Sequence, residues 1–430
     1  MDRTKPSLRR RLALPAIALS IASMGLSAVG AGSATAAPDR TAMGQISLNA
    51  KQTISFFTAA LGSELQATKA EIASFEKACP QIAVDLVQLP STSNDAYQSV
   101  THYFIAGSST PDVIDADTAW PASFARADWI LPLNKYVPTS IFLPRGAAAG
   151  TYDGKLYAAL FYFNAEGLYY RTDLVKVPPK TPQQLVTDAQ AALKEDPNLK
   201  EGLAFEGSKY EGFVTVFIDF MGAFGGGLNP ANFDTAANLQ ALEFLHDTVY
   251  TYHIAPQAVT GWTEQNVQEA FTSGQAAFAT NWPYVESLVG AKGSAVVGKA
   301  GYVPFPSVSG DGVATVASDA LVINARSTHV AADAAFVKWL LQPAQQIARA
   351  ITSGDPPSVS AAYTSALFAK APYFRADLAV FKTGVPRLVS ANYLQISSDI
   401  QDMLSSVMAN QASPAQALKT TAQQLAKLAS

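Results

Sequence analysis

The chain has 430 residues, of which 49% are hydrophobic and 15% are charged, and its formal net charge at pH 7 is −4. This length favours two lobes over a single hydrophobic core, and this composition excludes a disordered chain. The acidic balance disfavours nucleic acid or an anionic membrane surface as a partner.

The first 36 residues have the pattern of a secretory signal peptide. Three consecutive arginines at 9–11 precede an apolar stretch over 12–29, and an A-x-A cleavage site ends at Ala36. We expect residues 1–36 to be removed, which would lower the formal net charge from −4 to −8. A membrane anchor is the alternative, but Pro15 and several small polar residues interrupt the apolar stretch.

Strand and helix patterns alternate through the next part of the chain. We expect strands at 52–58, 82–89 and 111–117, separated by helices at 63–79 and 95–107. Strand–helix–strand alternation predicts a mostly parallel sheet with helices on both faces.

The second half of the chain shows the same alternation of strand and helix patterns. We expect helices capped by Thr181, Asp234, Thr263 and Ser413, because each residue can accept a hydrogen bond from the first turn. The stretch 313–324 reads as a strand pair or one long strand. No long linker separates the lobes, so the chain is expected to cross between them more than once, which predicts a hinge and a cleft.

Motifs of catalysis and metal binding are missing from the sequence. It contains no G-x-S-x-G, no H-E-x-x-H and no phosphate-binding loop, and its four histidines are scattered. The single cysteine, Cys79, cannot form an internal disulfide, and it lies far from any position for lipid attachment. We therefore expect no cofactor and no metal. A glycosidase with paired carboxylates stays an alternative, although the sequence nominates no pair.

Five stretches together resemble the carbohydrate-binding members of extracellular solute-binding protein family 1, in particular the trehalose/maltose/sucrose-binding subgroup of ABC transporter receptors. They are PDVIDADTAWPASFARADWILPL, YDGKLYAALFYFNAEGLYYRTDL, FEGSKYEGFVTVFIDFMGAFGG, EAFTSGQAAFATNWPY and SPAQALKTTAQQLAKL. The resemblance runs from about Ile54 to the end of the chain.

The resemblance implies an α/β, two-lobed periplasmic binding protein fold of type II, like maltose-binding protein, with the ligand cleft between the lobes. The predicted N-terminal lobe comprises 50–160 and 311–350, and the predicted C-terminal lobe comprises 161–310 and 351–430. It also implies a periplasmic receptor, expected to be a monomer, that delivers a small carbohydrate to the permease of an ABC importer. The sugar would be a disaccharide such as trehalose, maltose or sucrose, and no chemistry would occur.

The resemblance also nominates ligand-binding residues, four of which have a second possible role. Trp282 would stack on a sugar ring with Tyr284 beside it, or both would fill the core between the lobes. Asp117 would bind hydroxyl groups or cap a helix, and Glu64 would bind ligand or lie solvated in a first helical turn. The remaining nominated residues match or replace family positions: Asn164, Tyr210, Glu211, Ser318 and Asp319.

Three of the family positions differ in this chain. Asn164 stands where the subgroup usually has an Asp, and Ser318-Asp319 replaces part of a Gly-Gly-Trp-like segment. Val359 follows Pro356-Pro357-Ser358 where relatives often have an arginine. We therefore expect a more acidic site than in relatives. The alternative ligand is a non-sugar or cationic polar solute, such as an amino sugar.

Overall fold

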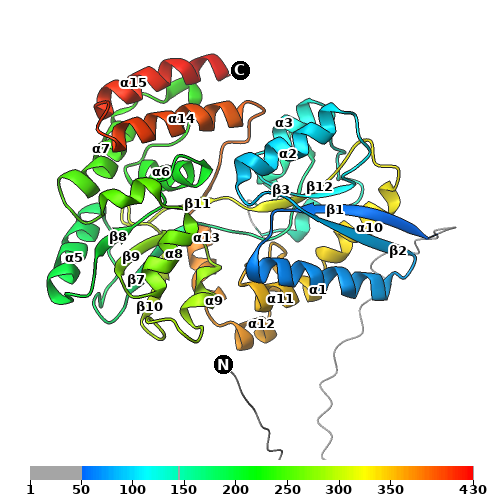
Figure 1. Cartoon of the computed structure of the whole chain (residues 1–430), viewed down its shortest axis with the longest axis horizontal. Coiled ribbons are helices and arrows are strands. Elements are labelled where there is room, and N and C mark those ends of the chain that lie inside the picture. The colour runs from blue at the N-terminus through cyan, green and yellow to red at the C-terminus, as the bar shows by residue number, and fades with distance from the viewer. Residues whose placement is uncertain (1–50, 144–145, 430) are drawn as a thin grey trace, which may run out of the picture. The chain divides into compact units, whose positions relative to one another are not determined.

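The computed structural model describes residues 51–143 and 146–429. The predicted signal peptide, 1–36, lies outside the described residues. The described chain is a mixed α/β structure built on two main sheets (Figure 1).

The strands of the described chain have the following bounds: β1 (Gln52–Thr58), β2 (Ile82–Gln88), β3 (Val113–Asp117), β4 (Thr151–Tyr152), β5 (Lys155–Leu156), β6 (Ala159–Leu160), β7 (Gly167–Arg171), β8 (Glu201–Ala204), β9 (Ala276–Asn281), β10 (Ala300–Val303), β11 (Ala314–Val316), β12 (Asp319–Ile323) and β13 (Gly384–Pro386).

The helices that connect and cover these strands are α1 (Gly62–Ala78), α2 (Ser93–Ile105), α3 (Pro121–Arg126), α4 (Gly146–Ala149), α5 (Pro182–Glu195), α6 (Glu211–Ala223), α7 (Ala236–Tyr250), α8 (Glu264–Thr272), α9 (Val285–Val289), α10 (Val330–Leu340), α11 (Pro343–Ser353), α12 (Ser365–Lys370), α13 (Phe374–Lys382), α14 (Tyr393–Met408) and α15 (Pro414–Leu425). Short 3-10 helices are η1 (Thr139–Ile141), η2 (Pro230–Asn232), η3 (Gln257–Gly261), η4 (Ser360–Ala362) and η5 (Ala426–Leu428).

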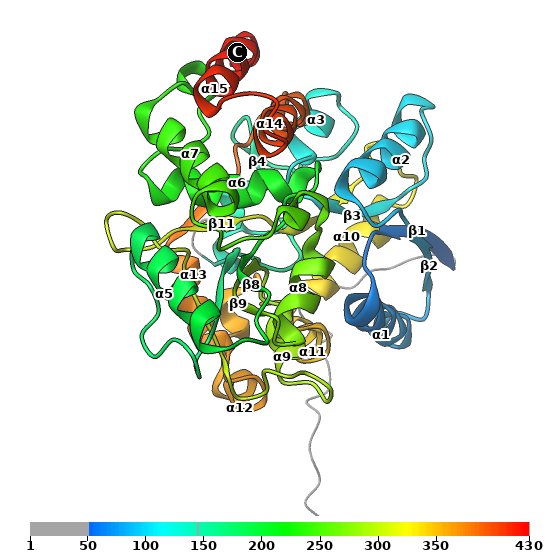
Figure 2. The same ribbon diagram turned by 60° about the vertical axis from the view of Figure 1, so that its left-hand side comes forward.

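The first main sheet has the strand order β2-β1-β3-β12-β6. β1 is parallel to β2 and β3, as the alternating pattern predicts, but β12 is antiparallel to both β3 and β6. The prediction of a mostly parallel sheet is therefore wrong for β12. The reason is that β12 is reached directly from β11, with no helical crossover to return it to the direction of β3. Helices α2 and α3 lie on one side of the sheet and α1 lies on the other (Figures 1 and 2).

The second main sheet has the order β10-β7-β9-β8, in which only β8 and β9 are parallel. Helices α5 and α8 pack against its strands, while α6, α7, α14 and α15 pack on one another in a separate helical layer. This layer is visible above the sheet in Figure 1.

Two stretches of chain, 161–166 and 304–318, connect a strand of one main sheet to a strand of the other, and we call them the crossing segments. They meet at a bridge between Ala165 and Val316. β11, inside the second crossing segment, also pairs in parallel with β13. The stretch predicted as a strand pair or one long strand is thus two strands, β11 and β12, in different sheets.

Most of the predicted helix starts agree with the structure. Thr181 and Thr263 form capping boxes, and the Ser413 hydroxyl accepts from the backbone of the first turn of α15. The cap predicted at Asp234 is wrong, because Thr235 is the residue whose side chain accepts the amide hydrogen of Asn238.

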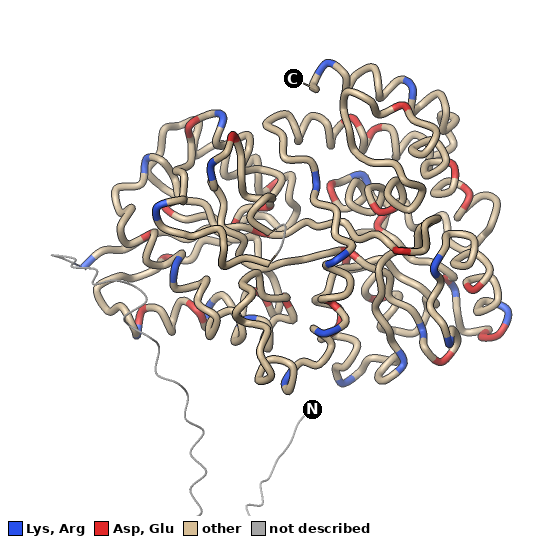
Figure 3. The backbone as a smooth tube through the Cα atoms, turned by 180° about the vertical axis from the view of Figure 1, so that it is seen from behind, with Lys and Arg blue, Asp and Glu red and all other residues tan. Residues whose placement is uncertain are grey.

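Acidic and basic residues are distributed over the whole described chain (Figure 3). Of the helices in 51–143 and 146–429, none combines the length and the apolar character that crossing a membrane would require.

Candidate functional site

Predicted site residues from distant parts of the sequence meet at the end of β3. Asp117 is the last residue of this strand, and Asp319, the first residue of β12, lies directly opposite it in the antiparallel register. Ser318 precedes Asp319; its carbonyl accepts from the Thr118 amide at 2.9 Å, and its amide donates to the Thr118 hydroxyl at 3.2 Å. Strand pairing therefore brings two carboxyl groups and a hydroxyl to one point.

An arginine from a third segment completes this group. The Arg387 guanidinium donates to the Asp117 carboxylate, and it donates through Nη1 to Glu211 Oε1 at 2.8 Å. Glu211 also accepts from the hydroxyls of Tyr393, at 2.7 Å, and Ser397. The five side chains link the end of β3 with the start of α6 and with α14.

The charges of this group stabilise one another in a buried setting. Burial raises the pKa of Glu211, while Arg387 and the hydroxyl donors oppose that rise. Burial alone would lower the pKa of Arg387, but Asp117 and Glu211 hold it well above its ordinary value. The Arg387 side chain is 5% exposed, so its charge depends on these two carboxylates.

A second acidic group adjoins the first through Asp319. This carboxylate accepts from the Tyr162 hydroxyl, and burial followed by the nearby Asp117 raises its pKa to about 6. Glu64, which is partly exposed in the first turn of α1, lies in the same electrostatic environment. Burial and then Asp355 raise the pKa of Glu64 well above its ordinary value.

Arg349 is the cation of this second group. Its guanidinium lies 3.2 Å from Glu71 and 3.1 Å from Asp355, and 4.1 Å from the centre of the Phe161 ring. Arg349 also lowers the pKa of Glu64, against the effect of burial. The buried ion pairs fix α11 against α1, the helix that carries Glu64.

Asn164 is joined to the site by the crossing segments. Its backbone amide donates to Ser318 Oγ at 3.0 Å. Its side-chain oxygen is buried and has no hydrogen-bond partner among the described residues. This oxygen is a hydrogen-bond acceptor that no described residue uses.

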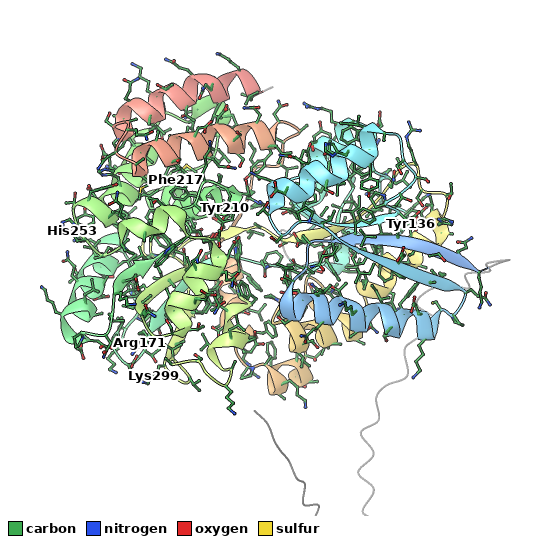
Figure 4. The ribbon with its side chains drawn as sticks, viewed as in Figure 1. Tyr136, Arg171, Tyr210, Phe217, His253 and Lys299 are labelled. Atoms are coloured by element: carbon green, nitrogen blue, oxygen red, sulfur yellow. The ribbon has the colours of Figure 1, made fainter. Side chains whose placement is uncertain are left out.

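Tyr210 lies at the start of α6, where Figure 4 labels it. Its hydroxyl donates to Glu206 at 2.6 Å and accepts from the backbone amide of Glu264 at 3.2 Å. Burial, and then Glu206, raises the pKa of Tyr210, so the phenol keeps the proton that it donates.

Trp282 and Tyr284 occupy a loop that side chains hold in place. The Tyr169 hydroxyl donates to the Trp282 carbonyl at 3.0 Å, and Asn281 accepts from the Trp282 amide at 2.8 Å. Tyr284 packs partly against a hydrophobic core, whereas the partly exposed Trp282 belongs to none of the hydrophobic clusters of the described chain. An indole fixed by its backbone and free of the core can offer its face to a ligand.

Tyr284 interacts electrostatically with acidic residues from two parts of the chain. Burial raises its pKa, and so do Glu264 and Glu206, which both hydrogen-bond to Tyr210, and Glu64 from α1. Among the nine predicted residues, Asp117, Ser318 and Asp319 meet at the end of β3, and the Asn164 amide bonds to Ser318.

Sequence reasoning missed several residues of this region. They are Tyr162, Glu206, Glu264, Arg349, Asp355 and Arg387. Arg387 reaches Asp117 from 270 positions away, although Val359 stands at the position where relatives often have an arginine. The only signal that could have identified Arg387 is an isolated cation inside the apolar stretch 384–389, where burial demands an acidic partner.

The arrangement is suited to binding polar molecules rather than to transforming them. It offers carboxylates, an amide and phenols for hydroxyl groups, and an indole for an apolar ring face. Within 51–143 and 146–429 there is no cluster of three or more His, Cys, Asp or Glu side chains that could hold a metal ion.

Two cavities with defined linings lie elsewhere in the chain. The larger, of about 500 Å³, is lined by Leu131, Pro132, Asn134, Lys135, Tyr136, Gly154 and Lys155. The other, of about 340 Å³, is lined by 225–229 and neighbouring residues. Neither includes a predicted site residue.

Comparisons with known proteins identify relatives of the chain. The sequence matches the family described as bacterial extracellular solute-binding protein over residues 59–347. A probable ABC transporter-binding protein of Deinococcus radiodurans is 31% identical over 367 residues, which cover 80% of this chain and 86% of the relative.

Solved structures share the whole fold. Maltose-bound MalE3 of T. maritima has a TM-score of 0.82 and 30% identity, covering 88% of this chain and 100% of that one. The GacH receptor of Streptomyces glaucescens, solved unliganded and with acarbose, has a TM-score of 0.78 and 24% identity, covering 88% and 98%. These similarities confirm the predicted α/β fold of the two-lobed, maltose-binding-protein type.

Replacing Arg387 tests whether it holds the first group together. Arg387→Ala leaves Asp117 and Glu211 buried without their cation, so the free energy of unfolding should fall by about 3–5 kcal/mol in a urea titration. The exposed Arg326 provides the control, since Arg326→Ala should change it by less than about 0.5 kcal/mol. Equal effects of the two substitutions would contradict the bridging role.

Proposed function

Because the chain belongs to the bacterial extracellular solute-binding protein family, we propose that it binds a small carbohydrate and delivers it to the permease of an ABC importer. Members of this family are carriers outside the cytoplasm, not enzymes. The ligand proposed is a disaccharide such as trehalose, maltose or sucrose. The maltose in the similar T. maritima structure supports this size class.

One observation carries the proposal. Hydroxyl-binding groups from separate segments converge where Asp117, Asp319 and Asn164 lie. The chain also holds a partly exposed indole, Trp282, in a loop outside the hydrophobic clusters of the described residues. A sugar needs both components, because its hydroxyls bind carboxylates and amides while its C–H faces pack on aromatic rings. We assign ligand contacts to the nine predicted residues and add Arg387.

The binding mechanism that we propose is ligand-stabilised closure of two lobes. The two main sheets and the crossing segments between them support the lobe boundaries proposed near 160 and 310, and we propose the third boundary near 350. Periplasmic binding proteins as a class close about a hinge, and a ligand that contacts both lobes favours the closed form. The permease would recognise that form.

The cellular setting is the remaining part of the proposal. The segment 1–36 would direct export, and Cys79 is too far along the chain to serve for lipid attachment, so the mature protein would be free in the periplasm. We propose that it acts as a monomer.

A cationic polar solute is the alternative ligand. The observation in its favour is the number of carboxyl groups near Asp319, namely Glu64, Asp115, Asp117 and Asp355, against the two arginines. Arg349 and Arg387 are each engaged by two carboxylates, which weakens this alternative.

A panel of ligands tests the proposed function. Thermal unfolding should shift upward with one of trehalose, maltose or sucrose, because a ligand that binds only the folded state stabilises it. At about 100 times the dissociation constant the gain is about 2.7 kcal/mol. Amino sugars, polyols and polyamines complete the panel, and a response confined to them would refute the disaccharide.

Truncation of Trp282 tests the stacking role. Trp282→Ala should weaken disaccharide binding by roughly 1–3 kcal/mol in calorimetry, as for buried aromatic anchors at interfaces. Trp282→Phe keeps an aromatic face and should lose less. Trp129, which packs among Phe104 and Phe124, provides the control, because Trp129→Phe should leave the affinity unchanged. Unchanged disaccharide affinity in Trp282→Ala would show that Trp282 has a structural role and does not stack on the ligand.

The charge of Asp319 tests the choice between ligand classes. Burial raises the pKa of Asp319 to about 6, so its carboxylate forms as the pH rises through that value. Affinity for a cationic solute should therefore increase through about pH 6 and should drop in Asp319→Asn, which loses the charge-assisted bond. Affinity for a neutral sugar should change little, because an amide still accepts from hydroxyls. Equal, negligible effects on both ligand classes would remove Asp319 from the site, and exposed Asp311→Asn serves as the control.

A further inference from the structure

Arg349 is a buried arginine outside the predicted ligand contacts, and its side chain reaches several separate segments of the chain. It lies in α11 and is 2% exposed. Because a buried charge is solvated by protein groups instead of water, the contacts of the guanidinium hold it in one orientation. Two chains of contacts lead from Arg349 to predicted ligand-binding residues, one to Glu64 and one to Asp319.

The first chain of contacts runs through α1. Arg349 Nη1 donates to Thr68 Oγ1 and to Glu71 Oε2, at 3.2 Å in each case. The Thr68 hydroxyl in turn donates to the Glu64 backbone carbonyl at 2.9 Å. Thr68 and Glu71 are 1% and 3% exposed, so water does not compete for these bonds. Arg349 therefore fixes the helical turn that carries Glu64.

The second chain of contacts runs through the first crossing segment. The guanidinium carbon of Arg349 lies 4.1 Å from the centre of the Phe161 ring and 5.0 Å from the centre of the Tyr162 ring. A guanidinium is attracted to an aromatic face, and more strongly where water is excluded. The Tyr162 hydroxyl donates to the Asp319 carboxylate. The position of the Tyr162 ring therefore determines where that carboxylate is held.

Other hydrogen bonds near Arg349 join the same segments without its help. Gln346, one turn earlier in α11, donates to the Phe161 carbonyl at 2.8 Å and accepts from the Ser358 amide at 2.9 Å. These bonds fix the backbone of the crossing segment against α11. What the Arg349 side chain adds is the orientation of the side chains around it.

We propose that Arg349 is a positioning residue for solute binding, which orients Glu64 through Thr68 and Asp319 through Tyr162. Arg349 touches no ligand, and its effect on affinity passes through these two neighbours. The guanidinium suits this role, because its planar fork donates in several directions while its face stacks on a ring, and a lysine ammonium cannot do both. The binding part of this proposal rests on the proposed function.

The test replaces Arg349 by lysine, which keeps the charge but not the fork. Calorimetry measures the dissociation constant for maltose in the wild type, Arg349→Lys, Thr68→Val and Tyr162→Phe. Arg349→Lys should raise it by roughly 10- to 100-fold, the range found when groups that orient metal ligands are replaced. Thr68→Val and Tyr162→Phe should each raise it by less, because each removes one hydroxyl and so interrupts one chain of contacts.

Double variants separate positioning from a general loss of stability. If Arg349 acts through Thr68 and Tyr162, adding Thr68→Val or Tyr162→Phe to Arg349→Lys should raise the dissociation constant by less than the product of the two single effects. Independent effects would multiply, and that result would reject the chain of contacts concerned.

Arg171→Lys is the matched control, because Arg171 is a similarly buried arginine in the second main sheet (Figure 4). Its side chain is 7% exposed and donates through Nε and Nη2 to Asp173, at 2.7 Å in each case. Arg171→Lys should lower the thermal unfolding temperature, as Arg349→Lys does, and should leave the maltose dissociation constant unchanged. Equal losses of affinity in the two variants would reduce Arg349 to a general contributor to stability.

Two measurements without ligand decide the positioning role independently of the proposed function. In Arg349→Lys, the amide hydrogens of 64–68 should exchange faster than in the wild type. The fluorine resonance of fluorotyrosine at position 162, assigned by its loss in Tyr162→Phe, should shift. Arg171→Lys should change neither signal. If Arg349→Lys fails to fold by circular dichroism, the affinities of Thr68→Val and Tyr162→Phe decide the question, and wild-type affinity in both would reject the proposal.

Each other result rejects a defined part of the proposal. Unchanged maltose affinity in a folded Arg349→Lys would reject the positioning role. Unchanged affinity in Thr68→Val alone, or in Tyr162→Phe alone, would reject that chain of contacts and leave the other. Absence of maltose binding in the wild type would count against the disaccharide function, while the exchange rates and the fluorine resonance would still decide whether Arg349 orients its neighbours.

Discussion

The pairing of Arg387 with Asp117 and Glu211 is the interaction on which the site depends. It joins the end of a strand in the first main sheet to the start of α6, which packs with the helices beside the second. If the buried Arg387 guanidinium lost its contact with either carboxylate, that carboxylate would be left without its cation. The same contact therefore holds the region together and limits the negative charge that a ligand meets there.

The crossing segments supply the second constraint. They bring Asn164 and Ser318, which lie 154 positions apart in the sequence, into hydrogen-bond contact. β11, in the second crossing segment, also pairs with β13, the strand that directly precedes Arg387. Asp319 lies opposite Asp117 because β12 runs antiparallel to β3 in one defined register. A shift of that register by one residue would turn the Asp319 side chain to the other face of the sheet. The polar groups that would bind a solute are thus held by sheet pairing and by buried hydrogen bonds.

The sequence predicts correctly those elements and caps that depend on a single short segment. The strand at 52–58 and the capping boxes at Thr181 and Thr263 follow from periodicity and from short-range hydrogen bonding. The direction of β12 was missed, because strand direction is set by how the chain returns to the sheet. Arg387 and Arg349 were missed for a similar reason, since their acidic partners lie far away in sequence.

The sequence by itself determined the class of fold, the alternation of elements and the family, because these depend on local periodicity and on motifs in a set order. It also nominated nine ligand-binding residues, of which Asp117, Ser318 and Asp319 meet through strand pairing. Tertiary structure alone decided which charges are neutralised, which carboxyls are buried so that their pKa is raised, and that Trp282 lies outside the hydrophobic clusters of the described residues. Those properties depend on burial and on distances between segments, and no local pattern of residues encodes either quantity.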